Sequence, residues 1–188
     1  MKQHWSLWES ELKDEEIAHI IEHCEKFPVE EAKVYPMDGG DGEVQKDVRR
    51  SEVRFITDQY CSELVWQYVK RANTTCYGFD IENSGFAMQY TAYHGSNEGH
   101  YDWHQDTDLI TDGFEDRKLS IVIQLSDPEK YEGGDFQFEL NGDAVTIPEF
   151  RKKGSILVFP SFLKHRVQNV TKGKRNSLVS WVMGPNFK

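Results

Sequence analysis

Apolar residues at helical spacing predict an amphipathic helix near the start of the chain. Within residues 12–27, the apolar positions from Ile17 to Cys24 follow the i, i+3, i+4, i+7 pattern that places them on one helix face. Acidic residues occupy positions 14–16, where a first helical turn interacts favourably with negative charge. Because a helix cannot readily continue through proline, we expect this one to end before Pro28.

The same pattern predicts a second helix over residues 58–72, where the apolar side chains again share one face. Either Thr57 or Asp58 can accept hydrogen bonds from the free amides of its first turn. Between the two helices, residues 36–47 are polar and rich in glycine, which is typical of a surface loop.

After residue 80 the pattern changes to short apolar or alternating runs separated by turn residues, which predicts strands. The runs cover residues 85–93, 119–125, 135–140, 144–147, 155–159, 165–170 and 178–183. Many short strands behind a helical front indicate an α+β fold with a jelly-roll core and the N-terminal helices packed on one sheet. We expect one domain over residues 1–188, with residues 1–80 as helical support with leading strands and residues 81–188 as the jelly-roll core.

Composition and charge narrow the functional classes. The chain has 188 residues, 38% hydrophobic residues and a formal net charge of −10, which argues against a nucleic-acid partner because such proteins usually gather basic residues on one face. No apolar stretch approaches the length that spans a bilayer, so we expect no membrane partner. Three cysteines without CxxC spacing indicate free buried thiols and a cytoplasmic location. We expect a monomer or a homodimer.

The densest group of metal-binding side chains lies at residues 100–108, with the sequence HYDWHQDTD. In extended chain, the histidines and aspartates at the even positions from His100 to Asp108 all point the same way. A His-x-Asp pair on one strand, closed by a distant histidine, is the arrangement that binds iron(II) on one face and leaves open coordination positions. Periodicity alone leaves two candidate pairs, His100 with Asp102 or His104 with Asp106.

The C-terminal half carries a set of motifs in a characteristic order. They are WHQD at 103–106, RKLS at 117–120, QLSDP at 124–128, YEGGD at 131–135, FPS at 159–161, HRV at 165–167 and GKRNSLVSW at 173–181. Together they resemble the prolyl 4-hydroxylase-like iron(II)/2-oxoglutarate dioxygenases, especially the small PKHD-type bacterial members. The resemblance covers roughly residues 85–183.

This resemblance implies the metal ligands. The WHxD element supplies the first two ligands in that family, which selects His104 and Asp106, and the HRV-like strand supplies the third, His165. The implied cofactor is Fe(II), with 2-oxoglutarate and O2 as cosubstrates and ascorbate in a supporting role. Because Asp106 is retained, the resemblance favours hydroxylation over halogenation, in which the carboxylate ligand is missing. The remaining histidines are not expected to be ligands, although His100 could approach substrate.

The resemblance also implies a binding site for 2-oxoglutarate. Arg175, ten positions after His165, matches the basic residue that binds the C5 carboxylate, and a planar guanidinium suits that role because it can make two parallel hydrogen bonds. Ser177 would share a strand face with Arg175 and add a hydroxyl. The same family comparison marks Tyr93, Gln124 and Trp181 as candidate cosubstrate-binding residues. For Tyr93 and Trp181, the alternative is that the aromatic rings fill the core.

The substrate is the least determined part of the prediction. The resemblance implies a prolyl residue in a peptide or protein, with succinate and CO2 as coproducts. Two alternatives remain, a hydroxylase of a free amino acid or another small molecule, and a jelly-roll binding module without catalysis. Residues 36–47 and 107–116 are candidate lids, because a reactive site has to be closed to water. The Gly-Gly pair at 133–134 is interpreted as a turn between strands.

Overall fold

The computed structural model describes residues 4–34, 41–82, 87–107 and 115–187. Helix α1 (Asp14–Cys24) lies inside the range predicted for the first helix, and the Glu16 side chain accepts a hydrogen bond from the Lys13 N–H at its start, at 2.9 Å. Helix α2 (Gln59–Ala72) begins after Asp58, whose side chain accepts a hydrogen bond from the Cys61 N–H at 2.8 Å. Of the two candidate caps, Asp58 is therefore the one used.

The larger sheet is antiparallel and has eight strands. Its spatial order is β1 (Ser6–Trp8), β11 (Ile156–Pro160), β7 (Glu115–Gln124), β13 (Val170–Pro185), β5 (Met88–His94), β4 (Glu52–Ile56) and β2 (Glu30–Glu31), with β8 (Tyr131–Gly133) also paired to β13. Helix α2 continues into a π-helical turn, Asn73–Tyr77, and short 3-10 turns at Gly95–Asn97, Pro128–Lys130 and Pro148–Arg151 connect strands.

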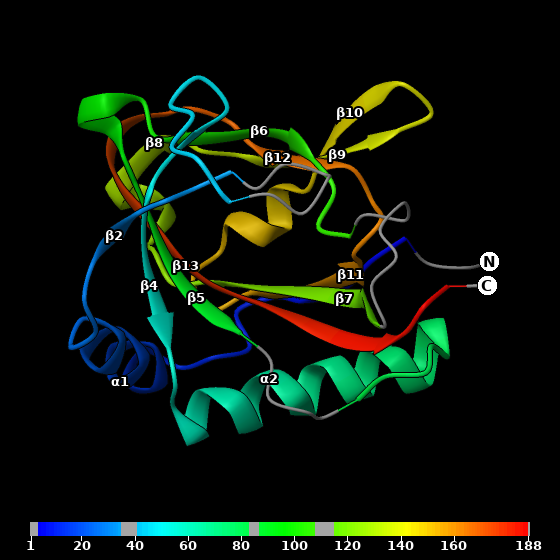
Figure 1. Ribbon diagram of the computed structural model, residues 1–188. Helices are drawn as coiled ribbons and strands as arrows, with labels where there is room; N and C mark the ends of the chain where they lie inside the picture. The colour runs from blue at the N-terminus through cyan, green and yellow to red at the C-terminus, as the bar shows by residue number, and fades with distance from the viewer. Residues whose placement is uncertain (1–3, 35–40, 83–86, 108–114, 188) are drawn as a thin grey trace.

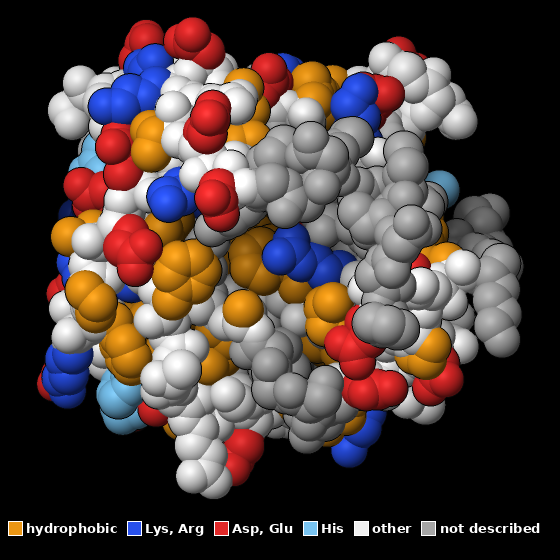
Figure 2. Space-filling view, in the orientation of Figure 1, with side chains coloured by type: hydrophobic (Ala, Val, Ile, Leu, Met, Phe, Trp, Pro, Cys, Tyr) orange, Lys and Arg blue, Asp and Glu red, His pale blue; other side chains and the backbone are white. Residues whose placement is uncertain are grey.

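The smaller sheet has five antiparallel strands in the order β10 (Asp143–Thr146), β9 (Phe136–Leu140), β12 (His165–Val167), β6 (His100–His104) and β3 (Arg49–Arg50). The two sheets face each other, and α1 and α2 cover the outer face of the larger sheet (Figure 1). This arrangement confirms the predicted α+β class with a jelly-roll core. In the same orientation, the surface is hollowed between the sheets, where hydrophobic and basic side chains are visible (Figure 2).

Each face of the larger sheet has its own apolar core. One core packs α1 and α2 onto the sheet, with Ile20, Cys61 and Ile121 inaccessible to solvent. The other lies between the two sheets and is rich in aromatic rings such as Phe138 and Phe159, also inaccessible. Because alternate side chains of one strand serve both cores, the larger sheet is buried on both faces, which explains the nearly continuous apolar runs in β7 and β11.

The predicted strands correspond to observed ones with three changes of extent. The run at 119–125 covers only the second part of β7, which begins at Glu115. The run at 178–183 is only the second half of β13, which begins at Val170 and pairs with β5, β7 and β8 along its length. The run at 165–170 is divided between β12 and the start of β13. Both Gly133 (φ 71°) and Gly134 (φ 65°) adopt the left-handed region, as expected for a turn that other residues would strain.

The candidate lids at 36–47 and 107–116 fall partly outside the described residues, and Asp108 lies outside them. The single-domain organisation stays a prediction. Among the residues that the structure describes, none of the helices has the length and apolar character needed to cross a membrane.

Candidate metal centre

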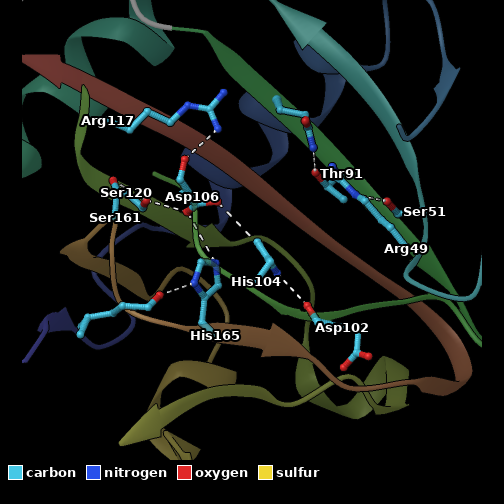
Figure 3. Close-up of polar contacts among 12 residues, drawn as sticks. Arg49, Ser51, Thr91, Asp102, His104, Asp106, Arg117, Ser120, Ser161 and His165 are labelled. Carbon is cyan, nitrogen blue, oxygen red and sulfur yellow. Dashed lines mark hydrogen bonds and ion pairs between the residues drawn. The ribbon is translucent and has the colours of Figure 1, made fainter. Parts of the chain in front are cut away.

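Three side chains converge at one end of the smaller sheet. His104 is the last residue of β6, and His165, the first residue of β12, is its direct partner across the two strands. Asp106 follows two residues after His104, and its carboxylate oxygens lie 3.7 Å from His104 Nε2 and 3.5 Å from His165 Nε2 (Figure 3). One donor atom from each residue lies within 4.8 Å of the others, close enough to surround one ion.

A bulge in β6 separates His104 from the alternative pair. His165 opposes His104 while Val167 opposes Tyr101, so two steps along β12 match three along β6. The extra residue reverses the alternation, and Tyr101 therefore shares a face with His104, whose ring it stacks on at 3.5 Å between centroids. The prediction that all even positions from His100 onward point the same way is wrong for this reason.

His100 and Asp102 instead face a separate groove of about 580 Å³ on the other side of β6. The ring nitrogens of His100 lie 2.8 Å from the Glu98 carbonyl and 3.2 Å from the Asp47 carbonyl. Neither side chain lines the cleft that contains His104. The structure thus separates two candidate pairs that periodicity could not distinguish.

Backbone hydrogen bonds orient both imidazoles. The Nδ1 atom of His104 lies 2.7 Å from the Asp102 carbonyl, and the Nδ1 atom of His165 lies 2.8 Å from the Leu163 carbonyl. A carbonyl oxygen can only accept, so each Nδ1 carries a proton, and the Nε2 atom facing Asp106 is the one that can bind a metal ion. Burial, assisted by the neighbouring His165, lowers the pKa of His104 to about 3, so its ring is neutral and available as a ligand.

Two serines hold the carboxylate. Ser120 Oγ donates to Asp106 Oδ2 at 2.6 Å and contacts Ser161 Oγ at 2.9 Å, and the Asp106 N–H donates to the Ser161 carbonyl at 2.9 Å. Burial raises the pKa of Asp106, but the adjacent His165 and His104 and the Ser120 hydrogen bond outweigh it, so the net pKa is lowered. The carboxylate is therefore ionised, and its position is fixed before any ion binds.

Besides Arg175, three of the four other residues predicted to bind the cosubstrate line the same cleft. Tyr93, Ser177 and Trp181 all face it, from β5 and β13. Trp181 Nε1 is buried without a hydrogen-bond partner. Tyr93 and Ser177 are 3% and 1% exposed, so both side chains are enclosed by the protein where they line the cleft.

Arg175 has the most distinctive environment in the cleft. It is 2% exposed, its Nη1 atom has no hydrogen-bond partner, and its guanidinium carbon lies 5.8 Å from the centre of the Tyr93 ring. No carboxylate forms an ion pair with it in the described part of the chain. A buried guanidinium without a partner is costly, and an anion bound in the cleft would satisfy it.

Gln124 does not line this cleft. It lies behind Arg175 in a small space beside Tyr131, to whose hydroxyl oxygen its Nε2 donates at 2.8 Å. Its Oε1 atom is buried without a partner. Direct contact of Gln124 with a molecule in the cleft therefore stays a prediction, while its packing near Arg175 is observed.

Several residues of the site were not singled out by the sequence analysis. Arg49 and Tyr101 line the cleft, Arg117 donates to the Asp106 carbonyl at 3.2 Å, and Ser120 and Ser161 orient the carboxylate. The last three lie within the RKLS and FPS motifs, so the motifs contained a signal for them. Arg49 lies in the N-terminal part of the chain, outside the range of the resemblance, and no local pattern marked it.

Residues 88–183 match the family model described as the 2OG-Fe(II) oxygenase superfamily. This range includes His104, Asp106, His165 and Arg175. It corresponds to slightly more than half of the chain, from β5 to β13.

Curated relatives include PKHD-type hydroxylases from cyanobacteria. The one from Synechococcus sp. (strain CC9311) is 41% identical over 85 residues, which cover 45% of this chain and 37% of that relative. The one from Prochlorococcus marinus is 38% identical over 86 residues, which cover 44% of this chain and 35% of that relative. The aligned part is thus little more than a third of each relative's length.

Solved structures share the fold over nearly the whole chain. A Pseudomonas putida prolyl-4-hydroxylase has a TM-score of 0.71 at 21% identity, with 95% of this chain and 91% of that chain covered. A prolyl hydroxylase from Trichoplax adhaerens, in complex with a hypoxia inducible factor peptide fragment, has a TM-score of 0.75 at 15% identity, with 96% and 84% covered. At these identities the likeness establishes the fold, including the N-terminal helices and strands outside the family match.

Proposed function

Because the chain belongs to the 2OG-Fe(II) oxygenase superfamily, we propose that His104, Asp106 and His165 hold Fe(II) and that the protein hydroxylates a substrate C–H bond. The family uses Fe(II), 2-oxoglutarate and O2, and succinate and CO2 accompany the hydroxylated product. The observation that carries the proposal is the convergence of two imidazole Nε2 atoms and one carboxylate, all within 4.8 Å, beside a buried guanidinium.

The donor set fits the metal. Two neutral imidazoles and one carboxylate are the ligands of facial iron(II) sites, which keep positions open for other molecules. The His104 and His165 rings are fixed in the required tautomer by the backbone carbonyls, and Asp106 is fixed by Ser120. When bound, the iron supplies the oxygen chemistry, while these residues hold it in place and shape the access to it.

The cleft also fits the cosubstrate. Arg175 presents an unpaired buried Nη1 atom, and Ser177 lies two residues away on the same strand, so both can bind a carboxylate in the cleft. We assign Arg175 and Ser177 to the C5 carboxylate of 2-oxoglutarate. Tyr93 and Trp181 form the cleft walls, and Gln124 supports Arg175 from behind.

For the substrate, we propose a prolyl residue of a peptide or protein. The support is the relatives, which are named PKHD-type hydroxylases, and the shared fold with prolyl hydroxylases, one of them in complex with a peptide. A free amino acid or other small molecule is the second candidate, since it would use the same metal site. A monomeric or homodimeric state and a cytoplasmic location complete the proposal.

A direct test measures binding and turnover separately. Isothermal titration of the protein with Mn(II), followed by 2-oxoglutarate, should show one site for each, and His165→Ala should abolish both. With Fe(II), 2-oxoglutarate, O2 and ascorbate, proline-containing peptides should gain 16 Da with matching succinate. Wild-type protein that binds no Mn(II) would refute the metal site, whereas binding without a mass gain on any peptide, but with succinate stimulated by small molecules, would support the second candidate.

A further inference from the structure

A second arginine, Arg49, lies in the cleft and has no part in the proposed metal or cosubstrate site. It is on β3, the edge strand of the smaller sheet, directly opposite Tyr101 of β6. Its side chain lines the same cleft as His104 and Arg175 and is 9% exposed. Arg49 is thus a mostly buried cation beside the metal triad (Figure 3).

The contacts of Arg49 use only part of its guanidinium group. Its Nε atom donates to Ser51 Oγ at 3.2 Å, and its guanidinium carbon lies 4.5 Å above the centre of the Tyr101 ring. In the described part of the chain, no carboxylate pairs with it and no acceptor takes a hydrogen bond from its two terminal nitrogens. These nitrogens form a fork that remains available to a molecule in the cleft.

The other charges in the cleft leave Arg49 without a counter-ion even when Fe(II) and 2-oxoglutarate are bound. The two positive charges of Fe(II) and the charge of Arg175 are balanced by Asp106 and by the two carboxylates of 2-oxoglutarate. Arg49 then remains as one uncompensated positive charge. A mostly buried charge is tolerated when a partner of opposite sign reaches it, and the substrate is the remaining component of the complex that can supply one.

We propose that Arg49 binds a carboxylate of the substrate and thereby selects substrates with a carboxylate close to the hydroxylated carbon. This inference rests on the proposed function and defines its substrate class more narrowly. The carboxylate has two sources, the free α-carboxylate of a terminal prolyl residue or free amino acid, and the side chain of an acidic residue next to the prolyl residue. Both present the planar group that a guanidinium fork binds with two hydrogen bonds.

The neighbouring Arg50 provides a matched control. It is adjacent in the chain and carries the same charge, but alternation along β3 turns its side chain to the opposite face. There it donates to the Asn97 carbonyl at 2.7 Å and lines the outer groove rather than the cleft. Removing this charge changes the net charge of the protein as much as removing Arg49 does, without changing the cleft.

The test measures peptide affinity for protein loaded with Mn(II) and N-oxalylglycine, a non-reactive analogue of 2-oxoglutarate, so it needs no turnover. Two matched pairs serve as probes: N-acetyl-Gly-Pro with a free carboxylate against its amide, and N-acetyl-Pro-Glu-amide against N-acetyl-Pro-Gln-amide. In wild type, the acidic member of one pair should bind about 30-fold more tightly than its neutral partner, as expected for a buried charge pair. The pair that shows the difference identifies the source of the carboxylate.

Arg49→Gln should remove this difference by weakening only the acidic peptide, and Arg49→Lys should restore part of it because the charge remains without the fork. Arg50→Gln should retain it. Equal binding of acidic and neutral members by wild type, or no binding of either acidic peptide, would overturn the inference without any variant having to fold. The inference would also be overturned if Arg49→Gln lowered the affinity for Mn(II) or N-oxalylglycine as strongly as the affinity for the peptide. Arg49 would then act by positioning Tyr101 and His104 and not by binding substrate. Wild type that fails to bind Mn(II) and N-oxalylglycine would refute the proposed function itself.

Discussion

The hydrogen bond from Ser120 to Asp106 provides the most direct test of how the site is preorganised. Ser120 is inaccessible to solvent, and its hydroxyl lies 2.6 Å from Asp106 Oδ2. Substitution by alanine removes a hydrogen bond to a charged group, worth about 1.5–3 kcal/mol. This hydrogen bond is present both with and without metal, so most of its energy stabilises the fold. Metal affinity depends only on how well the bond holds the carboxylate in place.

The expected loss of metal affinity lies at the low end of what residues that orient metal ligands contribute. Ser120→Ala should weaken Mn(II) binding about 10-fold, or ~1.4 kcal/mol. The lost hydrogen bond also removes one of the factors that lower the pKa of Asp106, so the acidic limit of Mn(II) binding should move to higher pH. Both effects can be followed by titrating Mn(II) calorimetrically from neutral pH down past the ordinary aspartate pKa of 3.8, because Asp106 gains its proton below that value.

Ser180→Ala is the matched control. Ser180 is equally inaccessible, lies on the adjacent strand opposite Ile121, and donates to the Ala87 carbonyl at 2.9 Å, but it does not line the metal cleft. Both variants should lose stability, by about 0.5–3 kcal/mol, because each removes a hydrogen bond donated by a buried hydroxyl group. A role of Ser120 in holding the metal ligand would be refuted if Ser120→Ala bound Mn(II) within about twofold of wild type, or if Ser180→Ala weakened binding as much as Ser120→Ala does.

Three further outcomes follow from the cleft, a helix cap and a turn. Arg175→Lys should weaken the binding of 2-oxoglutarate to Mn(II)-loaded protein about 10-fold with little change in Mn(II) affinity, because the charge remains but the two parallel hydrogen bonds are lost. If calorimetry gave the variant and wild type the same affinity for 2-oxoglutarate, the assignment of Arg175 would be contradicted. Asp58→Ala should lower the free energy of unfolding by about 1 kcal/mol in urea, since α2 loses its cap. Burial raises the pKa of Asp58, but the hydrogen bonds from Cys61 and the charge of His23 outweigh it, so the net pKa lies below the ordinary 3.8. The ionised carboxylate therefore stabilises the fold above pH 3.8, and this stabilisation is lost as the pH falls through the lowered pKa. Asp58→Asn should retain the cap and lack this pH dependence. Gly133→Ala should destabilise the protein more than Gly142→Ala. Both glycines have positive φ, but a Cβ added at Gly133 would lie 2.2 Å from a backbone oxygen, whereas no heavy atom lies within 4 Å of one added at Gly142. Similar urea midpoints for the two variants would contradict this expectation.

Local patterns in the sequence were sufficient for both long helices, about half of the strands and the fold class. The i, i+3, i+4 spacing of apolar residues predicted α1 and α2, and the short runs after residue 80 predicted four of the eight strands of the larger sheet and three of the five strands of the smaller one. Helix and strand periodicity can be read locally because it reflects which face of each element is buried. The motifs around His104, Asp106 and His165 further predicted that residues about 60 positions apart would meet, and the structure brings these three side chains together.

Three features of the site depended on the tertiary structure. The bulge in β6 arises from its pairing with β12, so no pattern within residues 100–108 could show that Tyr101, rather than Asp102, shares a face with His104. Gln124 lies behind Arg175 rather than in the cleft because β7 and β13 pair in a register that the sequence of either strand does not specify. Arg49 reaches the cleft only because an edge strand from the N-terminal part of the chain pairs with β6. Strand register and edge pairing are set by contacts between distant segments, and these contacts decided which polar side chains surround the metal site.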